Sequence, residues 1–550
     1  MKTLYKCIDS LVGVGLYSGK VFYIFRILTI SRLCKKTRRE RTEINMRINT
    51  IAEAVRRTAA RVPHHTAVVF NDREWSYREL DMAVTSIARK LREQGVKQGE
   101  RVAAYGKNSD LYILLFLATT RIGAIHVPVN FQLRAGELDY ILGDSDPTFV
   151  IADRDLANAI SQTKSNSHRQ VLRFEDEILE WAVSSDSRPL EDDEFDVEDD
   201  DVAQLLYTSG TTSDPKGAIM THRALMHHYM SCIHDLDIKE SDRALHCLPL
   251  YHSAQMHVFM LPALLVGGWN KVLPAPEAGA VLETIEKDTI TSFFAAPTVW
   301  VSIANHSDLT SRDLGNLRKA YYGASIMPGP ILERLQKCLP KLGFYNVFGQ
   351  SEMGPACTVL RPEEHADHPG SAGRPMLFVE ARVVDDEGNC VPAGELGEIV
   401  YRSPQLCLGY WNKSEATAKA FADGWFHSGD LVRQDENGYI EVIDRVKDVI
   451  NTGGVLVASR QIEDCIYELP QVSEVAVVGI PDEKWIEAVT AYVVIKAPVS
   501  EEEILQHVRN NLANYKVPKR VEFVDELPRN ASGKILKRQL RHVGGSKSAT

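Results

Sequence analysis

Short apolar runs alternate with longer amphipathic stretches along most of this chain. Apolar runs at residues 67–70, 101–105 and 124–129 predict buried strands, and residues 76–94 and 111–122 have the spacing of helices. Such alternation is typical of a largely parallel sheet that is covered by helices. We therefore expect an α/β fold, with a large N-terminal domain of mostly parallel sheets flanked by helices.

The pattern changes beyond residue 444. Strand-like runs at 474–479, 489–495 and 520–524 accompany one helical stretch at 501–512, which is typical of a compact α+β domain. The predicted division of the chain is an N-terminal extension at residues 1–45, a large domain at 46–444 and a small domain at 445–550.

Residues 1–45 differ in character from the rest. The apolar run at 11–33 is interrupted by basic residues, and a basic cluster at 34–41 follows it. These charges argue against a bilayer span, and no small-residue cleavage site follows the run. Two interpretations stay open: an amphipathic segment that makes peripheral membrane contact, or an extension outside the folded protein.

Composition excludes some classes of function. A chain of 550 residues with 44% hydrophobic residues is long enough for at least two domains and a large buried site. Its formal charge of −11 provides no basic field for nucleic acid. The nine cysteines are scattered without a Cys-x-x-Cys pair, which favours reduced thiols and a cytoplasmic location.

The first candidate chemistry lies at residues 205–217. An apolar run at 202–207 predicts a strand that ends in a loop of hydroxyl side chains, glycines and a lysine. Hydroxyls, backbone amides and one cation can together bind a polyphosphate. The residues expected to do so are Thr208, Ser209, Gly210, Thr211, Thr212 and Lys216.

This loop is not a Walker A loop. Pro215 stands before Lys216 where glycine is needed, and Gly217 follows where Ser or Thr is needed. An ordinary polar loop before a helix capped by Thr221 remains the alternative.

Two later segments suit a nucleotide. The predicted strand at 318–325 ends in Gly323, Ala324 and Ser325, which give a flat floor for a planar base. Asp430 follows a glycine and can accept from both hydroxyls of a ribose, while Arg445 can reach the same sugar or its phosphate. A charged turn that caps a neighbouring segment is the alternative for Asp430.

The loop at 205–217 resembles the signature of the adenylate-forming superfamily, which includes acyl-CoA synthetases, firefly luciferase and peptide-synthetase adenylation domains. Four further segments resemble motifs of this family in the family's order, at residues 247–256, 344–352, 424–447 and 528–537. The chain departs from the family pattern at Ser213 (usually Gly), Phe348 (usually Tyr), Ser351 (usually Thr) and the apolar run 455–457 (usually polar).

The resemblance implies roles for individual residues of the large domain. His252 would position the acid, beside an acyl wall that includes Met256, Phe259 and the nearby apolar helix expected at residues 258–266. Glu352 would hold Mg²⁺ together with the Thr208 hydroxyl. The segment that contacts adenine would include Asn346, Phe348 and Gly349.

For the small domain, the resemblance implies that Lys534 neutralises charge at the α-phosphate during adenylation. The small domain would then rotate about a hinge at Lys447. Gly453 and Gly454 would leave room for the thiol of coenzyme A.

The implied function is that of an ATP-dependent acid:CoA ligase that uses ATP, Mg²⁺ and coenzyme A, most similar to bacterial fatty-acid:CoA ligases. The expected substrate is a medium- or long-chain fatty acid. Three alternatives stay open. One is an acyl- or aryl-adenylating enzyme that acts on another carboxylic acid or transfers the acyl group to the phosphopantetheine of a carrier protein, and the others are a luciferase-like oxidising enzyme and an inactive nucleotide-binding paralogue.

Overall fold

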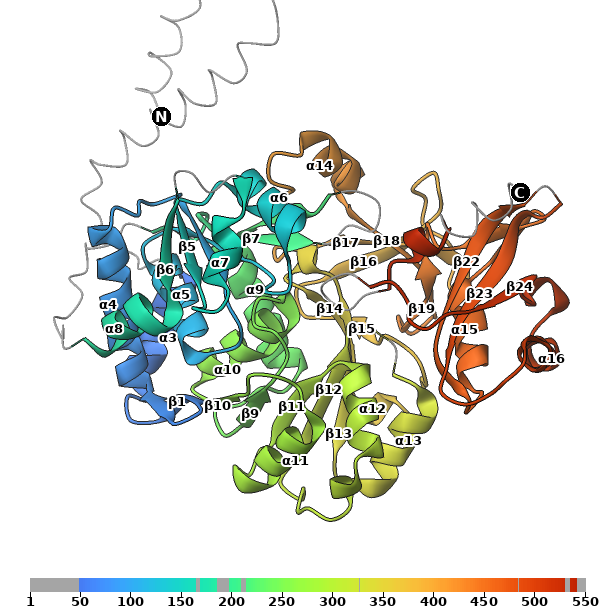
Figure 1. Ribbon diagram of the computed structural model, residues 1–550, viewed down its shortest axis with the longest axis horizontal. Coiled ribbons are helices and arrows are strands. Elements are labelled where there is room, and N and C mark those ends of the chain that lie inside the picture. The colour runs from blue at the N-terminus through green and yellow to red at the C-terminus, as the bar shows by residue number, and fades with distance from the viewer. Residues whose placement is uncertain are drawn as a thin grey trace, which may run out of the picture. The chain divides into compact units, whose positions relative to one another are not determined.

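The computed structural model describes residues 49–164, 169–184, 197–208, 214–325, 327–482, 484–529 and 535–541. The expected N-terminal extension lies outside these ranges, as do the predicted site residues Ser209, Gly210, Thr211, Thr212 and Lys534. Within these ranges no helix is long and apolar enough to cross a membrane. Sheets covered by helices make up the large domain, and a smaller sheet with its own helices follows (Figure 1), so the expected fold class is confirmed.

A six-stranded sheet forms the first part of the large domain. Its strands are parallel except for the last one, β8, which pairs antiparallel with β7. The predicted parallel arrangement is therefore correct here. Across the sheet the strands are β6 (Gln170–Arg173), β5 (Phe149–Ala152), β3 (Arg101–Tyr105), β4 (Ile125–Pro128), β7 (Val202–Thr208) and β8 (Lys216–Thr221).

Helices α3, α4, α5 and α8 contact one another beside this sheet. Helix α4 starts at Ser76, whose hydroxyl forms a reciprocal capping box with Glu79. Every residue of α5 is buried, so this helix is enclosed by protein on all sides. The helices of this part are α3 (Ile51–Arg61), α4 (Tyr77–Glu93), α5 (Asp110–Arg121), α6 (Ala135–Ser145), α7 (Ala157–Ser161), α8 (Leu179–Val183) and α9 (His222–Asp235), with the π-helix η2 (Phe174–Ile178).

A nine-stranded sheet forms the second part of the large domain. Its central strands are parallel, and the antiparallel strands β2, β14 and β15 lie at its two ends. A Cβ atom on Gly323 would lie 2.2 Å from the Val347 carbonyl oxygen, so glycine is needed where β12 approaches β13. The order is β15 (Arg374–Pro375), β14 (Ala356–Leu360), β13 (Gly343–Gly349), β12 (Lys319–Gly323), β11 (Ser292–Ala295), β9 (Arg243–His246), β10 (Trp269–Val272), β1 (Thr66–Phe70) and β2 (Arg73–Ser76).

One helix of this part differs from the expectation. The sequence predicts a single helix over residues 258–266, but the chain forms the π-helix η3 (Ala254–Met260) and then α10 (Leu261–Val266). Pro262 lacks the N–H that a regular α-helix would direct to the residue 258 carbonyl, so the regular ladder cannot continue through it. The remaining helices here are α11 (Ala278–Lys287), α12 (Pro297–Asn305) and α13 (Gly329–Cys338), with the short 3-10 turns η4 (Ser307–Leu309), η5 (Ser351–Met353) and η6 (Pro362–Glu364).

A four-stranded antiparallel sheet completes the large domain. It pairs Asp430 directly with Arg445 on the neighbouring strand. Its strands are β16 (Glu380–Val384), β17 (Leu396–Arg402), β18 (Phe426–Gln434) and β19 (Ile440–Arg445), and α14 (Ser414–Ala420) and the 3-10 turn η7 (Ala422–Gly424) precede β18.

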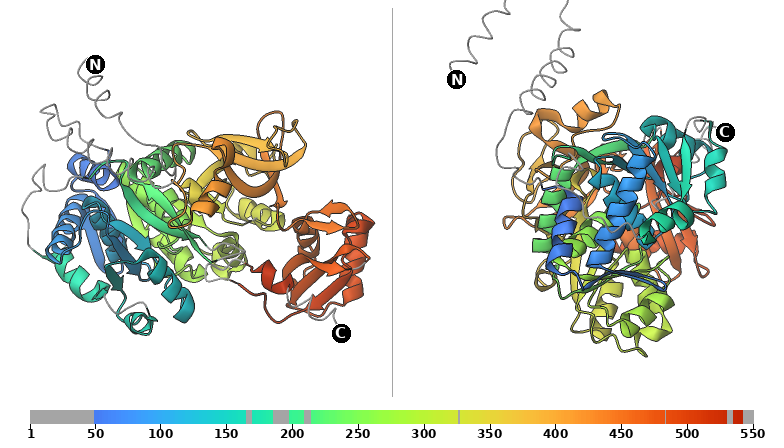
Figure 2. Two further views of the ribbon diagram at one scale, coloured as in Figure 1. Left: turned by 90° about the horizontal axis from the view of Figure 1, so that it is seen from above. Right: turned by 90° about the vertical axis from the view of Figure 1, so that its left-hand side faces the viewer.

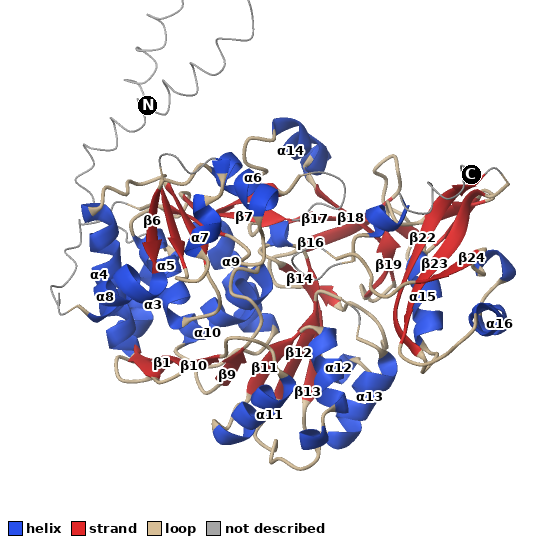
Figure 3. Cartoon of the chain, viewed as in Figure 1, coloured by secondary structure: helices blue, strands red, loops and turns tan. Residues whose placement is uncertain are grey.

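The small domain has one sheet with α15 and α16 packed on the same face, which is visible in the red part of Figure 2. The expected strands and helix are present, and β22 and β23 extend further than expected because they form one long antiparallel hairpin. Figure 3 shows the change from the helix-rich large domain to this sheet. The elements are β20 (Ile450–Thr452), β21 (Val455–Val457), α15 (Ser459–Tyr467), β22 (Val472–Asp482), β23 (Ile486–Ile495), α16 (Glu501–Asn511), the 3-10 turn η8 (Asn514–Lys516) and β24 (Arg520–Phe523).

Candidate functional site

The predicted phosphate loop joins the two antiparallel strands β7 and β8. Thr208 ends β7 and lies opposite Lys216, which begins β8, and the Thr208 hydroxyl donates to the Lys216 carbonyl at 3.4 Å. Strand β8 therefore separates the loop from α9, although Thr221 does cap that helix as expected. The loop residues between these two ends lie outside the described ranges, so their predicted contacts stay predictions.

Tyr207 stabilises this hairpin through its hydroxyl group and its ring. Its hydroxyl donates to the Asp144 carboxylate at 2.6 Å, and its ring lies against Gly217. A Cβ atom on Gly217 would approach the ring to 3.1 Å, closer than most real Cβ contacts. Glycine therefore allows β8 to start directly over the tyrosine ring.

Glu352 lies in the short turn η5, which contacts β8. Its side chain is buried, with 8% of the residue exposed, and its carboxylate accepts a hydrogen bond from the Tyr410 hydroxyl at 2.9 Å. The Lys216 ammonium lies 5.0 Å from the centre of the Tyr410 ring, within the range of a cation–π contact. A continuous series of contacts thus connects Thr208 and Lys216 with Glu352.

Tyr410 was not predicted as a site residue. It lies in residues 407–411, here called the edge segment, which runs antiparallel to β8. The segment also binds Glu352 directly, because the Cys407 N–H donates to the Glu352 carbonyl at 2.9 Å. The sequence signal for this position was only a glycine followed by two aromatic residues, which has no charge or metal-ligand character.

His252 lies next to the turn that carries Glu352. The adjacent Ser253 hydroxyl is 3.2 Å from the Ser351 hydroxyl, which brings the segment of His252 to the start of η5. Burial lowers the pKa of His252, so the imidazole is neutral at physiological pH. A neutral ring can orient a carboxylic acid by hydrogen bonding, which is compatible with the predicted role.

The two predicted wall residues are enclosed in the core. Met256 has 2% and Phe259 has 6% of its surface exposed. The Phe259 ring stacks on Phe294 with 4.2 Å between ring centres and contacts Tyr321 at 5.0 Å. Aromatic rings therefore fill the space behind η3, between that helix and strands β11 and β12.

The predicted adenine floor has a fixed backbone. Ala324 has a φ of 65°, a left-handed conformation that is unusual for a residue other than glycine. The Asn346 amide donates to the Ser371 carbonyl at 2.8 Å, so its NH₂ group is already bonded within the protein. Phe348 is half-buried and packs against the hydrophobic cluster that contains Phe259 and Tyr321. One N–H of the Asn346 amide is therefore used within the protein, whereas its second N–H and its carbonyl oxygen can still bind a base. The predicted contact of Asn346 with adenine stays a prediction.

The predicted ribose pair is brought together by β18 and β19. The Arg445 Nε lies 2.8 Å from the Asp430 carboxylate, and its Nη1 donates to the Ser428 carbonyl at 3.1 Å. Asp430 is buried, with 3% exposed. An acceptor carboxylate held by an arginine at a strand edge suits the hydroxyls of a sugar.

The predicted hinge and thiol segment are partly described. Lys447 is exposed, and its carbonyl accepts from Arg541 at 3.3 Å. Gly453 and Gly454 form the turn between β20 and β21, and both have positive φ, as a two-residue hairpin turn requires. Leu456 is 70% exposed beside this turn. Lys534 lies outside the described residues, so its reach stays a prediction.

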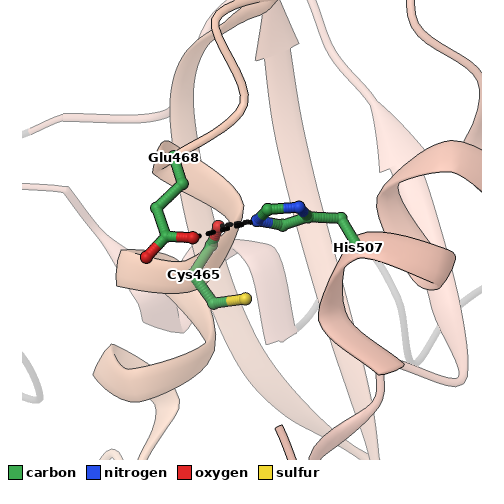
Figure 4. Close-up of side chains that lie close together, drawn as sticks. All are labelled: Cys465, Glu468 and His507. Carbon is green, nitrogen blue, oxygen red and sulfur yellow. Dashed lines mark hydrogen bonds and ion pairs between the residues drawn. The ribbon is translucent and has the colours of Figure 1, made fainter. Parts of the chain in front are cut away.

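A second group of ligand-type side chains lies in the small domain. In Figure 4 the His507 Nε2 points between Glu468 and the backbone carbonyl of Cys465, and these contacts measure 3.1 and 3.0 Å. Burial raises the pKa of the Cys465 thiol to about 11, so the thiol is protonated. Hydrogen bonds between α15 and α16 account for this cluster, and we assign no metal to it.

Comparison with known proteins shows which family this chain resembles. The family model described as AMP-binding enzyme matches residues 55–411, and the one described as AMP-binding enzyme C-terminal domain matches residues 461–534. A feruloyl-CoA synthase of an Amycolatopsis species is 38% identical, over 89% of this chain and 98% of that protein. A long-chain-fatty-acid–CoA ligase of Mycobacterium tuberculosis, FadD13, is 33% identical over 86% and 93%. The structure of ATP-bound MatB from Rhodopseudomonas palustris has a TM-score of 0.83 at 30% identity, over 90% of this chain and 99% of that one.

Proposed function

Because the chain belongs to the AMP-binding enzyme family, we propose that it activates a carboxylic acid as its acyl-adenylate and transfers the acyl group to coenzyme A. The observation that carries this proposal is the series of contacts from Thr208 and Lys216 through Tyr410 to Glu352. These groups provide a cation, a hydroxyl and a buried carboxylate within one small region. That combination suits a magnesium-bound polyphosphate.

The chemistry requires activation of the acid. A carboxylate cannot transfer its acyl group directly, because oxide would have to leave. Attack of a carboxylate oxygen on the α-phosphorus of ATP releases pyrophosphate and gives a mixed anhydride with AMP. The thiolate of coenzyme A then attacks the acyl carbon, and AMP departs with the electron pair of the broken C–O bond.

We assign the residues of the first step as follows. Lys216 and the loop between β7 and β8 bind the phosphates. Lys534, from the small domain, neutralises charge that develops at the α-phosphate. Asp430 accepts from the ribose hydroxyls, with Arg445 holding the carboxylate in place.

The donors present fit Mg²⁺. Thr208 offers a hydroxyl at the end of β7, and Glu352 offers a carboxylate in the adjacent turn, and Mg²⁺ prefers such oxygen ligands. When bound, this ion provides Lewis-acid stabilisation of the phosphate oxygens. The contribution of the protein is to hold the Glu352 carboxylate in a fixed, buried position.

The second step requires space for the thiol. We assign the hinge to Lys447 and the lining of the thiol path to Gly453 and Gly454, whose turn lacks side chains. Rotation about the hinge removes Lys534 from the site and admits the thiol. A carrier-protein phosphopantetheine would need the same space, so comparing coenzyme A with a loaded carrier protein distinguishes these acceptors.

For the acid, we propose a compact acid with a ring, of the hydroxycinnamate type. Similarity to a feruloyl-CoA synthase over nearly its whole length supports this choice. The ring stack of Phe259, Phe294 and Tyr321 also supports it, because it includes a residue of the expected acyl wall and aromatic side chains pack favourably against a ring. The second candidate is the medium- or long-chain fatty acid expected from the sequence, which similarity to the mycobacterial fatty-acid ligase favours.

A substrate panel tests both the reaction and the acid. Purified protein with ATP, Mg²⁺ and coenzyme A should form thioesters of ferulate and coumarate with a higher kcat/KM than those of octanoate or palmitate. A preference for palmitate would overturn the assignment of the acid but not of the reaction. Absence of pyrophosphate–ATP exchange with every acid would overturn the reaction itself and favour an inactive nucleotide-binding protein.

Two neighbouring residues of β11 provide a matched pair for the pocket. Phe294 contacts Phe259, whereas Phe293 points to the other face of the sheet and contacts Trp300 at 5.2 Å. Phe294→Leu should raise the ratio of kcat/KM for octanoate to that for ferulate. Phe293→Leu removes a ring of equal size and should leave this ratio unchanged.

A further inference from the structure

We propose that Tyr410 is a positioning residue that holds the Glu352 carboxylate and the Lys216 ammonium apart, so that each stays available to magnesium–ATP. This inference rests on the proposed function, in which Glu352 is a metal ligand and Lys216 binds phosphate. It adds a residue with no charge of its own to the site. The hydroxyl, the ring and the backbone of Tyr410 each contribute to this role.

The hydroxyl fixes the carboxylate. Tyr410 donates to Glu352 Oε1 at 2.9 Å, and within the described part of the chain it is the one side chain that donates to this carboxylate. A tyrosine hydroxyl is protonated at neutral pH, so it acts as a donor to the carboxylate. One carboxylate oxygen is thus bonded to a neutral group, which leaves the negative charge of Glu352 intact.

The ring of Tyr410 faces the ammonium, while its hydroxyl binds the carboxylate. The Lys216 ammonium lies 5.0 Å from the centre of the Tyr410 ring, and these two described residues, Lys216 and Glu352, form no ion pair. Opposite charges this close to one buried site would otherwise pair, since burial strengthens their attraction. A direct pair would neutralise both groups before magnesium–ATP arrives.

The backbone places the ring accurately. Three hydrogen bonds join the edge segment to β8: Leu408 N–H to Ile219 O, Ile219 N–H to Gly409 O, and Trp411 N–H to Gly217 O, at 2.8 to 2.9 Å. Gly409 has a φ of 136°, and a Cβ atom there would lie 2.5 Å from Thr417. Strand β8, which starts with Lys216, therefore also fixes the segment that bears the Tyr410 ring.

Two substitutions distinguish the hydroxyl from the ring. Tyr410→Phe keeps the ring and loses the bond to Glu352, so the magnesium concentration for half-maximal pyrophosphate exchange should rise about tenfold, with little change in kcat. Tyr410→Leu also loses the ring, so Lys216 pairs with Glu352 and the affinity for metal-free ATP should fall about tenfold as well. Tyr410→Phe should leave the affinity for metal-free ATP unchanged.

Tyr207→Phe is the matched control. It removes a tyrosine–carboxylate bond of 2.6 Å from the neighbouring strand β7, and this bond ends on Asp144 rather than Glu352. Its magnesium requirement should match that of the wild-type protein. A tenfold shift in this control too would show a general loosening of the hairpin and would overturn the specific role of Tyr410.

Direct binding measurements separate this inference from the proposed reaction. Titration of Mn²⁺ into the protein–ATP complex, followed by electron paramagnetic resonance, should show about tenfold weaker metal binding for Tyr410→Phe. The same substitution in a Glu352→Gln background should cause no further loss. Unchanged Mn²⁺ affinity in Tyr410→Phe overturns the inference even if the enzyme is active. Absent pyrophosphate exchange in the wild-type protein overturns the reaction, while the Mn²⁺ titration still decides the role of Tyr410.

Discussion

Charged side chains are arranged in opposite ways in two regions of this molecule. Beside β8, Lys216 and Glu352 face a neutral tyrosine and form no ion pair with each other. Near the start of α15, by contrast, Lys537 lies 2.8 Å from Glu463 and donates to the Ser459 hydroxyl at 2.7 Å. The first arrangement keeps charge available for a ligand, and the second uses charge to join the end of the chain to the small domain.

The second region continues into the large domain. The Asp444 carboxylate accepts from the Ser459 N–H at 2.6 Å and from its hydroxyl at 2.7 Å, so the last residues of β19 bond to the N-terminus of α15. Burial lowers the pKa of Lys537, but Glu463 and Asp444 outweigh burial and the pKa is raised. The lysine therefore stays charged. The comparison predicts that substitutions beside β8 reduce activity, whereas those near α15 reduce stability.

Glu352→Gln tests the first half of this comparison. The amide keeps an acceptor for the Tyr410 hydroxyl but removes the charge, so pyrophosphate exchange should fall about 10²- to 10³-fold. The free energy of unfolding should change by less than about 1 kcal/mol. Full exchange activity in this variant would remove Glu352 from the metal site.

Lys534→Ala tests whether the small domain contributes a charge to the site. Adenylate formation should fall about a hundredfold, because one cation at the α-phosphate is lost. Thioester formation from a supplied acyl-adenylate should persist, since the second step proceeds with this lysine withdrawn. Equal losses in the two half-reactions would argue against rotation of the small domain.

Glu463→Gln tests the second half of the comparison. It leaves the Lys537 charge without its carboxylate in a largely buried position, so the free energy of unfolding should fall by about 3 kcal/mol in chemical denaturation. Glu468→Gln, at an exposed position beside the end of the same helix, is the control and should cost less than about 0.5 kcal/mol. Equal, small effects of the two changes would show that the lysine pair contributes little.

Acid should weaken the large domain through its buried histidines. Burial lowers the pKa of His126 and His257 to about 3 and of His222 and His246 to about 4. The unfolded chain binds these protons near its ordinary pKa of about 6.5, so stability is present at pH 7 and is lost as the pH falls below that value. Between pH 7 and pH 6 the four histidines together should lower the free energy of unfolding by about 2.5 kcal/mol. Denaturant unfolding at the two pH values measures this difference. A stability that stays constant over this interval would contradict the assignment of neutral, buried rings.

Asp444→Asn should have the smallest effect. The asparagine oxygen still accepts from the α15 N-terminus, but the charge that favours the helix dipole and Lys537 is lost. We expect a loss of about 1 kcal/mol in unfolding free energy. A loss as large as that of Glu463→Gln would mean that the contact between β19 and α15 contributes more than a cap.

Periodicity was sufficient to predict several strands and helices of the large domain and the principal strands of the small one. Residues 101–105 and 111–122 have unambiguous strand and helix spacing, and the structure places them in β3 and α5. Local pattern failed at residues 216–221, which form β8. That strand is short, and it gains its partners from β7 and from a segment almost two hundred residues later. Pairing of this kind is not encoded in local spacing.

The predictions for the site show the same difference between local sequence patterns and long-range pairing. Glu352, Asp430 and Arg445 were found because charged residues stand in motif order, and the structure pairs Asp430 with Arg445 directly. Tyr410 was missed because its position depends on the pairing of the edge segment with β8, and an isolated tyrosine has no pattern. The bond of the Asn346 amide to Ser371 was likewise not predictable from the sequence, since it joins strand β13 to a loop 25 residues later.

The edge segment has one more consequence. Strand β8 is the last strand of its six-stranded sheet, and an uncovered last strand offers free N–H and C=O groups to a second molecule. Residues 407–411 occupy these groups through their own hydrogen bonds. A change that detaches them, such as bulk at Gly409, would therefore appear first as concentration-dependent self-association, before any loss of helical signal.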